Sequence, residues 1–379
     1  SREYLNSNDS VSKSHARQPG KINLYSLFIL RSILLLKKQG ILAYINPNNL
    51  LRTTTYDIIR KKILDTTRIK NIVDLGSGVF DDVTASTIVI VLQKEDDIEK
   101  RKNNNLFVVS EINDLTKKQC VSKTLRQSDF ENNTSYTFNI STNNQERPLF
   151  NKIENNSEKL GDITIIHAGG IATGPDKKSM IWDYKKTSNH KPLLEGKDIK
   201  PYLPQFSNRF ILYNRALLYR AREESIFLSK EKLITQRIGG GERVLVVSYD
   251  NNQYYTFNST NTILQKNKEY SLKYLAALLN SRLINWYYVN KFTNKSTLTV
   301  NISKTFLEQL PIKKPSNNQQ KEIVDKVDLI IGLKEEKNYL TSPDKKDKVK
   351  EYEKQIDQLV YKLYELTPEE IEIVENFGK

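Results

Sequence analysis

The first residues with the types and spacing of a cofactor site are Asp74-Leu75-Gly76-Ser77-Gly78. An Asp-x-Gly-x-Gly stretch can bind a methyl donor or a dinucleotide, because its glycines let the N-terminus of a following helix approach the ligand. Here only residues 79–85 separate the glycines from the next apolar run, which is too short for such a helix. That length suits a turn between antiparallel strands. We therefore predict a strand connection at this point rather than a cofactor loop.

A second candidate site combines arginine with glycine. Arg237 and Arg243 flank the turn Gly239-Gly240-Gly241. Guanidinium groups beside a glycine turn suit close approach to a phosphate or to a guanine edge, where arginine binds in a bidentate way. A solvated hairpin tip explains either arginine equally well when it is taken singly.

Lysines in polar loops are less specific candidates for contacts to phosphate. A lone pair of lysines in a turn is more often simply solvated, so none of them identifies a site by itself. The candidates are Lys177 and Lys178 after Gly174-Pro175, Lys197 and Lys200, and a loop with Lys291, Lys295 and Lys304. The histidines His15, His167 and His190 have no cysteine or carboxylate spacing that builds a metal site, so we expect none.

Composition limits the class of protein. The 379-residue chain is long enough for two or three domains, and it carries a net charge of +14, from 59 Lys and Arg against 45 Asp and Glu. Such a basic excess favours a polyanionic partner, nucleic acid first, although an AT-rich genome also inflates lysine. Cys120 is the only cysteine, which excludes a disulfide framework and fits a reducing cytoplasm. No apolar run reaches the roughly 18 residues of a membrane span.

Apolar periodicity predicts the elements that position Asp74. The helix at 21–38 has a nearly continuous apolar surface, so we expect it to be mostly buried. The run at 84–92 is almost wholly apolar and predicts a strand that is buried on both faces. The predicted order is a helix at 21–38, a strand at 42–45, a helix from Tyr56 to Leu64, strands at 69–75, 84–92 and 106–109, and a polar linker at 112–144 with one small helix at 114–120.

From about Leu160 the pattern predicts a second, β-rich domain with short strands and Gly- or Asn-rich turns. An amphipathic helix at 272–288 follows. Two further helices, at 319–337 and 348–366, predict an antiparallel hairpin. The predicted strands are 163–168, 210–213, 233–236, 244–248 and 254–256.

In this order, the segments resemble the distal part of adenine-N6 DNA methyltransferases of the restriction–modification type, followed by a TaqI-like specificity domain. Residues 24–52 and 71–94 look like the helix, strand and last β-hairpin behind the catalytic loop of those enzymes. The specificity domain is matched by HAGGIATGPDKKSMIW, PLLEGKDIKPYL, LITQRIGGGERVLVVSYD, LAALLNSRLINWYY and LEQLPIKKP. IDQLVYKLYELTPEEIEIVE is similar to the tail of single-chain restriction endonuclease–methyltransferases.

The resemblance implies an α/β plus α+β fold in three parts. Residues 1–150 would be the trailing half of a class I S-adenosylmethionine-dependent methyltransferase sheet. Residues 151–318 would form a β-rich, mixed target-recognition domain, and residues 319–379 a helical hairpin tail. The donor loop and the Asn-Pro-Pro-Tyr catalytic loop of the family precede residue 24 and do not occur here, since Asn46-Pro47-Asn48 is a different motif on another strand. Because the chain starts at Ser1 rather than Met, we expect methyltransferase domains, and in a fused enzyme a nuclease domain, upstream in the same polypeptide.

The resemblance also implies a role for Phe80. In the family, an aromatic residue at this point of the hairpin packs on the adenine that has left the duplex. An ordinary apolar plug under the hairpin is the other interpretation. The implied partner is double-stranded DNA, and the implied cofactor is S-adenosylmethionine, which this chain alone should neither bind nor use.

Two other functions remain open. One is a specificity subunit of a multi-subunit restriction system, which binds DNA without catalytic activity. Such a subunit should have two recognition domains and should lack the 21–94 unit. The other is a fragment of an RNA methyltransferase, which binding to DNA and RNA would distinguish.

Overall fold

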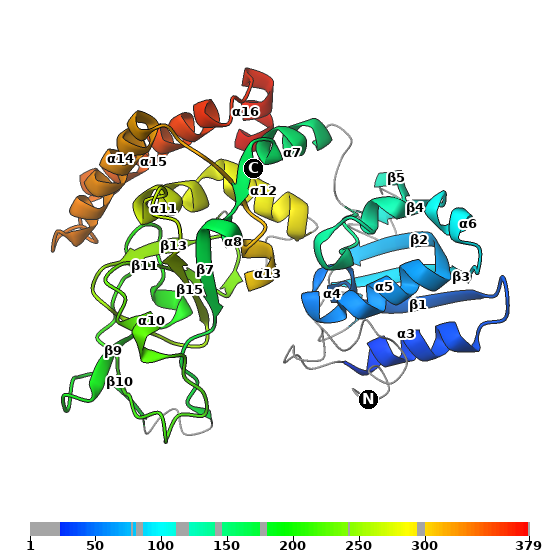
Figure 1. The fold of residues 1–379 in the computed structure, drawn as a ribbon, viewed down its shortest axis with the longest axis horizontal. Helices are drawn as coiled ribbons and strands as arrows, with labels where there is room; N and C mark the ends of the chain where they lie inside the picture. Colours follow the sequence, from blue (N-terminus) through cyan, green and yellow to red (C-terminus); the bar gives the residue numbers. More distant parts are fainter. Residues whose placement is uncertain are drawn as a thin grey trace. The chain divides into compact units, whose positions relative to one another are not determined.

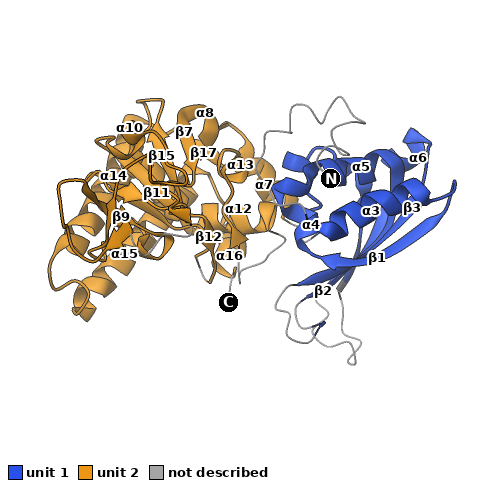
Figure 2. Ribbon diagram, turned by 90° about the horizontal axis from the view of Figure 1, so that it is seen from below, with its two compact units in different colours: residues 1–141 blue, residues 142–379 orange. Residues whose placement is uncertain are grey.

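The computed structural model describes residues 23–76, 79–80, 86–110, 121–140, 146–174, 180–241, 243–293 and 300–377. The chain divides into two compact units, residues 1–141 and residues 142–379 (Figure 2). Each unit has its own hydrophobic core. Among the described residues, no helix has both the length and the apolar character needed to cross a membrane.

Unit 1 contains a five-stranded sheet with the order β1-β3-β2-β4-β5. β3 pairs antiparallel with both β1 and β2, whereas β2 and β4 run parallel. The prediction of a strand connection after Asp74 is confirmed by the pairing, because β3, the next strand among the described residues, is the antiparallel partner of β2. The strands are β1 (Ile41–Pro47), β2 (Thr67–Gly76), β3 (Thr87–Lys94), β4 (Asn105–Ser110) and β5 (Val121–Arg126).

Helices cover one face of this sheet. The helices α3 (Leu24–Leu35) and α5 (Asp57–Thr66) lie on the same side (Figure 2), where they bury the inward residues of β3. The opposite face is apolar but uncovered among the described residues: Ile41 is 62% exposed, and Ile45 and Phe107 are also exposed. The outer side of α3 is exposed as well. The predictions that α3 is mostly buried and that β3 is buried on both faces therefore fail, because each has only one described layer against it.

The predicted linker at 112–144 is folded over residues 121–140. It contributes β5 and two short 3-10 helices, Gln127–Phe130 and Thr134–Tyr136. Phe130 and Phe138 stack with ring centres 4.9 Å apart in the core of unit 1. The buried Arg60 on α5 holds this segment by donating to the carbonyl oxygen of Ser135 at 2.7 Å. The predicted helix at 114–120 lies outside the described residues. Short helices α4 (Asn49–Arg52) and α6 (Ile98–Lys102) also belong to the unit.

Unit 2 is built around two four-stranded sheets, with orders β13-β11-β15-β7 and β14-β9-β10-β8. The first is antiparallel throughout. The predicted short strands are present, and the turn-rich stretches between them hold others that the sequence did not reveal. The strands of these two sheets are β7 (Thr164–Ala168), β8 (Ile181–Trp182), β9 (His190–Leu194), β10 (Phe210–Leu212), β11 (Lys232–Gln236), β13 (Val247–Asp250), β14 (Tyr255–Thr256) and β15 (Thr260–Gln265). Two smaller sheets have two strands each. In one, β6 (Ser157–Lys159) pairs with β17 (Pro311–Lys313), and in the other β12 (Ile238–Gly239) pairs with β16 (Val300–Asn301).

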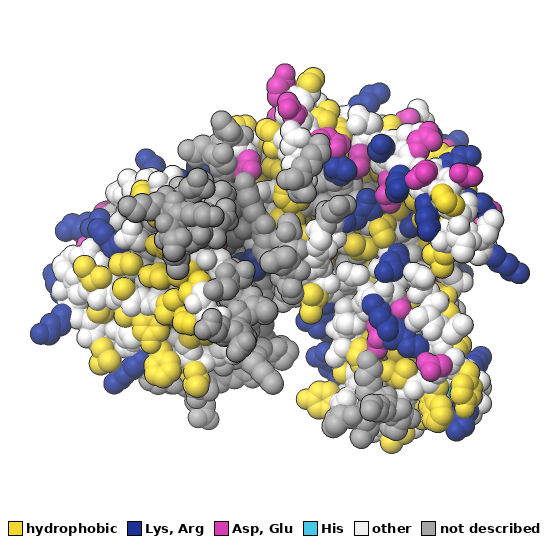
Figure 3. Space-filling view, turned by 180° about the vertical axis from the view of Figure 1, so that it is seen from behind, with side chains coloured by type: hydrophobic (Ala, Val, Ile, Leu, Met, Phe, Trp, Pro, Cys, Tyr) yellow, Lys and Arg dark blue, Asp and Glu magenta, His cyan; other side chains and the backbone are white. Residues whose placement is uncertain are grey.

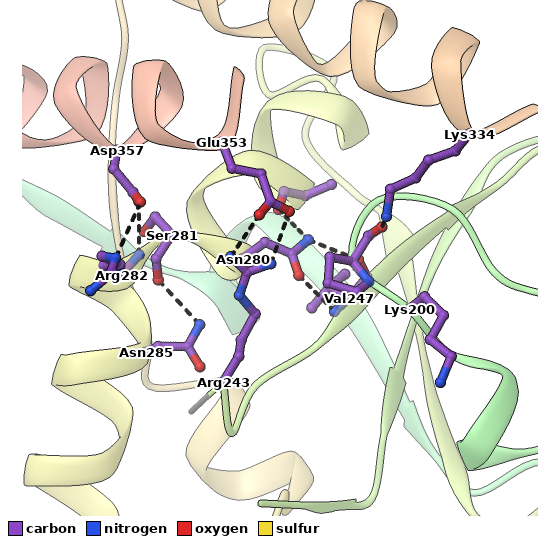
Figure 4. Close-up of polar contacts among 12 residues, drawn as sticks. Lys200, Arg243, Val247, Asn280, Ser281, Arg282, Asn285, Lys334, Glu353 and Asp357 are labelled. Atoms are coloured by element: carbon purple, nitrogen blue, oxygen red, sulfur yellow. Dashed lines mark hydrogen bonds and ion pairs between the residues drawn. The ribbon is translucent and has the colours of Figure 1, made fainter. Parts of the chain in front are cut away.

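The predicted helix at 272–288 is two helices, α11 (Leu272–Asn280) and α12 (Arg282–Phe292). Ser281 separates them because its backbone is extended and its side chain accepts the N–H of Ile284. Asn280 pairs through its side chain with both backbone groups of Val247 (Figure 4), so the break fixes the helices to the strand.

The predicted hairpin is α14 (Asn317–Glu335) and α15 (Pro343–Leu363), which lies along α11 (Figure 1). Ile323 and Val360 from the two helices enter the same core as α11 and α12. The hairpin is thus packed into unit 2. Further α-helices among the described residues of unit 2 are α7 (Arg147–Glu154), α8 (Leu160–Ile163), α10 (Glu224–Phe227), α13 (Lys304–Leu307) and α16 (Pro368–Glu375).

Candidate nucleic-acid interface

Three arginines converge on the loop that follows β7. Arg222 donates from Nε to the carbonyl oxygen of Gly169 at 3.1 Å and from Nη2 to that of Ala168. Arg237, at the end of β11, donates from Nη1 to the carbonyl oxygen of Asn258 at 3.1 Å. A methyl group at Gly169 would lie 3.4 Å from Nη2 of Arg220 and 3.5 Å from Nη1 of Arg237. Guanidinium groups from separate segments therefore meet at one glycine.

The electrostatic surroundings of this cluster are positive. Burial, and then the charge of Arg220, lower the pKa of Arg222. Burial, and then Arg220 and Arg222, lower the pKa of Arg237. Burial, Arg222 and Lys304 likewise lower the pKa of His167 on β7. Like charges held this close repel one another, so a bound anion would stabilise them.

No carboxylate in the described part of the chain forms an ion pair with Arg220, Arg222 or Arg237. Other arginines of unit 2 are paired in the ordinary way, so the cluster is a local exception. The pairs are Arg209 with Glu195 and Asp198, Arg215 with Glu223, Arg243 with Glu353, and Arg282 with Glu375. We call Arg220, Arg222 and Arg237 the arginine cluster.

Glycines allow the close packing around the arginine cluster. At Gly170, a methyl group would lie 2.0 Å from the carbonyl oxygen of Thr256, so only glycine fits there. At Gly239, a methyl group would likewise lie 2.0 Å from the carbonyl oxygen of Val244. Gly240 and Gly241 are exposed, and Gly241 has a φ of +77° with no heavy atom within 4 Å of a methyl group there. The turn predicted from Gly239 to Gly241 is therefore anchored at its first residue and open at its end.

Arg243 differs from the arginine cluster because it has an acidic partner. Its guanidinium group binds both carboxylate oxygens of Glu353 on α15, at 3.1 and 3.3 Å (Figure 4). Burial lowers the pKa of Arg243, but Glu353, together with Tyr202 and Asp357, raises it, and the net shift is upward. The adjacent pocket of about 540 Å³ is lined by acidic as well as basic side chains, among them Asp357 and Arg282. The charge of Arg243 is thus already balanced within the fold, which argues against the open phosphate or guanine contact predicted from the sequence.

The predicted lysines are distributed over unit 2. Lys197 and Lys200 are exposed, and the backbone of Lys200 is held by the hydroxyl group of Ser248 (Figure 4 labels the lysine). Lys291 pairs with Glu154 and Lys304 with Glu308. Lys177, Lys178 and Lys295 lie outside the described residues. Figure 3 shows basic side chains on both units, while acidic ones gather toward the C-terminal helices at the top of that view.

Phe80 lies in unit 1, between β2 and β3. Its side chain is 48% exposed, which a plug in a hydrophobic core would not be. At the end of β2, Gly76 has a φ of +69° and donates its N–H to Asp74 Oδ1 at 3.0 Å. Burial raises the pKa of Asp74. The carboxylate therefore holds the backbone at the last residue of β2.

Arg220 and Arg222 were missed in the sequence. Both lie in the segment Asn214–Arg222, whose three arginines in nine residues are a usable signal. The sequence offers no role for His167 beyond the exclusion of a metal site, and only the pairing of β7 in the sheet brings it near Arg222.

Comparisons with known proteins agree with the sequence resemblance. Residues 191–312 match the model of the TaqI-like C-terminal specificity domain, and residues 2–80 match the Eco57I restriction-modification methylase. The resemblance to a restriction–modification methyltransferase with a TaqI-like specificity domain is thereby confirmed.

A putative type II restriction enzyme and methyltransferase of Methanocaldococcus jannaschii is 24% identical over 93% of this chain and 30% of its own length. The type II restriction enzyme and methyltransferase RM.Eco57I of Escherichia coli is 28% identical over 40% of this chain and 15% of its own length. The chain therefore spans less than a third of either relative. Among solved structures, the type IIL restriction-modification enzyme MmeI in complex with DNA shares the fold, with a TM-score of 0.58 and 10% identity over 99% of this chain and 54% of that one.

Proposed function

We propose that this chain recognises a specific sequence in double-stranded DNA as part of a site-specific adenine-N6 DNA methyltransferase of a restriction–modification system. The observation that carries the proposal is the arginine cluster, which has no ion pair to a carboxylate among the described residues, in the unit that contains the specificity-domain match. Duplex DNA supplies the missing anions through its phosphates, and its base edges offer the acceptors that arginine reads.

The three arginines would make different kinds of contact with DNA. Arg222 and Arg237 already donate to backbone carbonyl groups, so their guanidinium groups are oriented before DNA arrives. Oriented groups lose little conformational entropy on binding, which suits the reading of a base edge. Arg220 is exposed and lies beside them, which suits a phosphate contact. Lys197 and Lys200, with Lys177, Lys178 and Lys295, would add further phosphate contacts.

Unit 1 would connect recognition to methyl transfer. The apolar face of its sheet, which no described helix covers and which includes Ile41 and Ile45, is what a partial α/β domain exposes when another layer belongs against it. We propose that upstream methyltransferase domains of the parent polypeptide supply this layer and bind S-adenosylmethionine. In that parent, Phe80 would stack on the adenine that has left the duplex. A specificity subunit has no need of such a unit, so its presence favours the methyltransferase over that alternative.

Binding to DNA tests the proposal directly. Duplexes captured repeatedly by the chain from a random-sequence pool should converge on one sequence. Affinity for that duplex should fall steeply between about 50 and 200 mM salt, because phosphate contacts release counter-ions. An RNA duplex of the same sequence should bind less tightly, since its deep, narrow major groove hides the base edges.

Single substitutions then separate the arginines. Arg237→Ala should relax discrimination at a base pair by about 1–3 kcal/mol. Arg243→Ala should lower the free energy of unfolding instead, because it leaves Glu353 without its partner. Lys321→Ala, which removes one exposed charge from α14, controls for net charge. A chain that selects no sequence and binds equally at both salt concentrations would refute the proposal.

A further inference from the structure

Two large apolar side chains project from the loop that carries Arg220 and Arg222 of the arginine cluster. In the segment Asn214–Arg222, Leu217 is 60% exposed and Tyr219 is 81% exposed. Leu218 lies between them and is buried, in a small core that it shares with Ile171 and Phe227. The loop is therefore attached to the fold by its middle residue, and it turns both neighbours of that residue toward solvent.

This exposure does not come from a loosely held loop. The carbonyl oxygen of Asn214 accepts the N–H groups of Leu217 at 3.0 Å and Leu218 at 3.2 Å, and its side chain accepts that of Ala216 at 3.1 Å. Further along, Arg220 exchanges two backbone hydrogen bonds with Ala172, at 2.7 and 3.1 Å. The segment is thus fixed on both sides of Tyr219.

The neighbouring loop is shaped to accommodate the tyrosine. Gly174 has a φ of +68°, and a methyl group there would lie 3.4 Å from Cβ of Tyr219. The left-handed backbone at Gly174 strongly favours glycine. The loop after β7, which receives the guanidinium groups at Gly169, therefore also meets the base of Tyr219 at Gly174.

The charge around these side chains indicates what covers them. Arg220 follows Tyr219 directly, and Arg222 and Arg237 meet Arg220 beside Gly169. An apolar protein surface would leave these charges without counter-ions, whereas a nucleic acid offers phosphates beside flat apolar bases. Proteins that contact DNA in this way insert apolar side chains at a base step while basic residues hold the backbone.

We propose that Leu217 and Tyr219 form a wedge that enters the bound DNA duplex at the base step beneath the arginine cluster, with the Tyr219 ring stacked on a base. The inference rests on the proposed function, because it needs the duplex as ligand. The wedge holds open one step of the duplex, and the bend that follows brings more phosphates to the arginines.

The first test is affinity, measured with a duplex that the unsubstituted chain has selected from a random-sequence pool. Tyr219→Ala should weaken binding roughly tenfold, which is the size of one lost stacking contact. The slope of log Kd against log salt should stay unchanged, because no phosphate contact is lost, whereas Arg220→Ala should reduce that slope by about 1. Tyr219→Phe should retain most of the affinity, since the ring face remains. Thermal melting should be the same for all variants, because the Tyr219 side chain is exposed.

The second test observes the stacking itself. Tyr219→Trp adds an indole to a chain with 2 tryptophans, and stacking on a base should quench the added emission when the duplex is bound. Leu340→Trp, at an exposed position between α14 and α15, is the matched control and should show no such quenching.

The outcomes separate the two proposals. If the duplex binds tightly, but Tyr219→Ala binds equally well and the added emission is unchanged, the wedge is refuted while sequence recognition stands. If the unsubstituted chain selects no duplex, the proposed function fails and the wedge fails with it.

Discussion

Arg237 keeps its guanidinium group beside two other arginines, where burial and like charge lower its pKa. Arg243, at the other end of the same glycine turn, has Glu353 as its partner. A single acidic side chain on α15 therefore decides which arginine is available to a ligand. In the sequence the two residues are equivalent, since each lies beside the same three glycines. Their different surroundings follow from the helix that packs over one end of the turn.

Phe80 is the residue for which the structure sharpens a prediction. Because its ring is half exposed, Phe80→Ala should cost well under the roughly 3–5 kcal/mol of a buried phenylalanine. In the intact parent enzyme, duplex binding should be nearly unchanged and methyl transfer slower. The fluorescence of 2-aminopurine at the target base, which reports stacking, should change as well. Phe80→Trp should keep much of the activity.

The control for Phe80 is a second exposed aromatic residue of the same unit. Phe28→Ala, on the outer side of α3 and away from the open face of the sheet, removes a comparable ring, and we expect methyl transfer at the normal rate. A Phe80→Ala enzyme with a lower melting temperature, whose folded fraction methylates normally, would assign Phe80 to packing.

At the scale of elements, the hairpin α14–α15 is joined to the other parts of unit 2 by buried charge. Asp357 on α15 accepts the N–H of Arg282 at 2.8 Å, and Glu353 binds Arg243 (Figure 4). Lys334 on α14 donates to the carbonyl oxygen of Pro201 at 2.7 Å, and burial lowers its pKa to about 8. These contacts connect both helices to the strands and loops that carry the glycine turn.

Asp357 should make the stability of unit 2 depend on pH. Burial raises its pKa to about 6, above the value of about 3.9 in an unfolded chain. The folded state therefore holds the proton more tightly, and the contribution of Asp357 is fully present below about pH 4 and lost as pH rises through 6. Relative to Asp357→Asn, the unsubstituted chain should lose up to about 3 kcal/mol of unfolding free energy between pH 4 and 7.

Urea unfolding at several pH values measures this difference. Asp325→Asn, at an exposed carboxylate of α14, controls for the lost charge. If the free-energy difference between the chain and its Asp357→Asn variant were the same at pH 4 and pH 7, the carboxyl group would not be protonated in the folded state at low pH.

At the scale of the whole molecule, recognition and methyl transfer would require different parts of the polypeptide. The arginine cluster is built entirely within unit 2, so the proposed recognition would use no residue of the cluster from unit 1. Unit 1 instead has one helical layer against its sheet and an apolar face left open among its described residues. This asymmetry predicts that the chain binds DNA but does not methylate it.

The predicted absence of a donor site from this chain gives a direct test at this scale. Calorimetry with the chain alone should detect no micromolar binding of S-adenosylmethionine, because Asp74 supports a turn between strands rather than a helix N-terminus. The longer parent enzyme should bind it and is the positive control. Micromolar affinity of the chain alone would restore Asp74 to Gly78 as a cofactor loop.

Local pattern was sufficient for much of the fold. The strand–helix–strand–strand order around Asp74, the short strands of unit 2 and the hairpin all follow from apolar period and turn residues, which act over a few neighbouring positions. The same local argument rejected a helix after Gly78, because seven residues cannot hold one that packs across a sheet. The resemblance to restriction–modification methyltransferases was likewise readable, since it depends on the order of segments.

Only the tertiary structure decided the site. Arg222 and Arg237 come from different segments, and they meet because β7, β11 and β15 pair in one sheet. The role of Arg243 depended on Glu353, which is 110 positions away. The exposure of Phe80, Leu217 and Tyr219 could not be predicted from the sequence either, because apolar residues are usually expected to lie in a core. Charge pairing and burial are set by long-range contacts, and no local period encodes them.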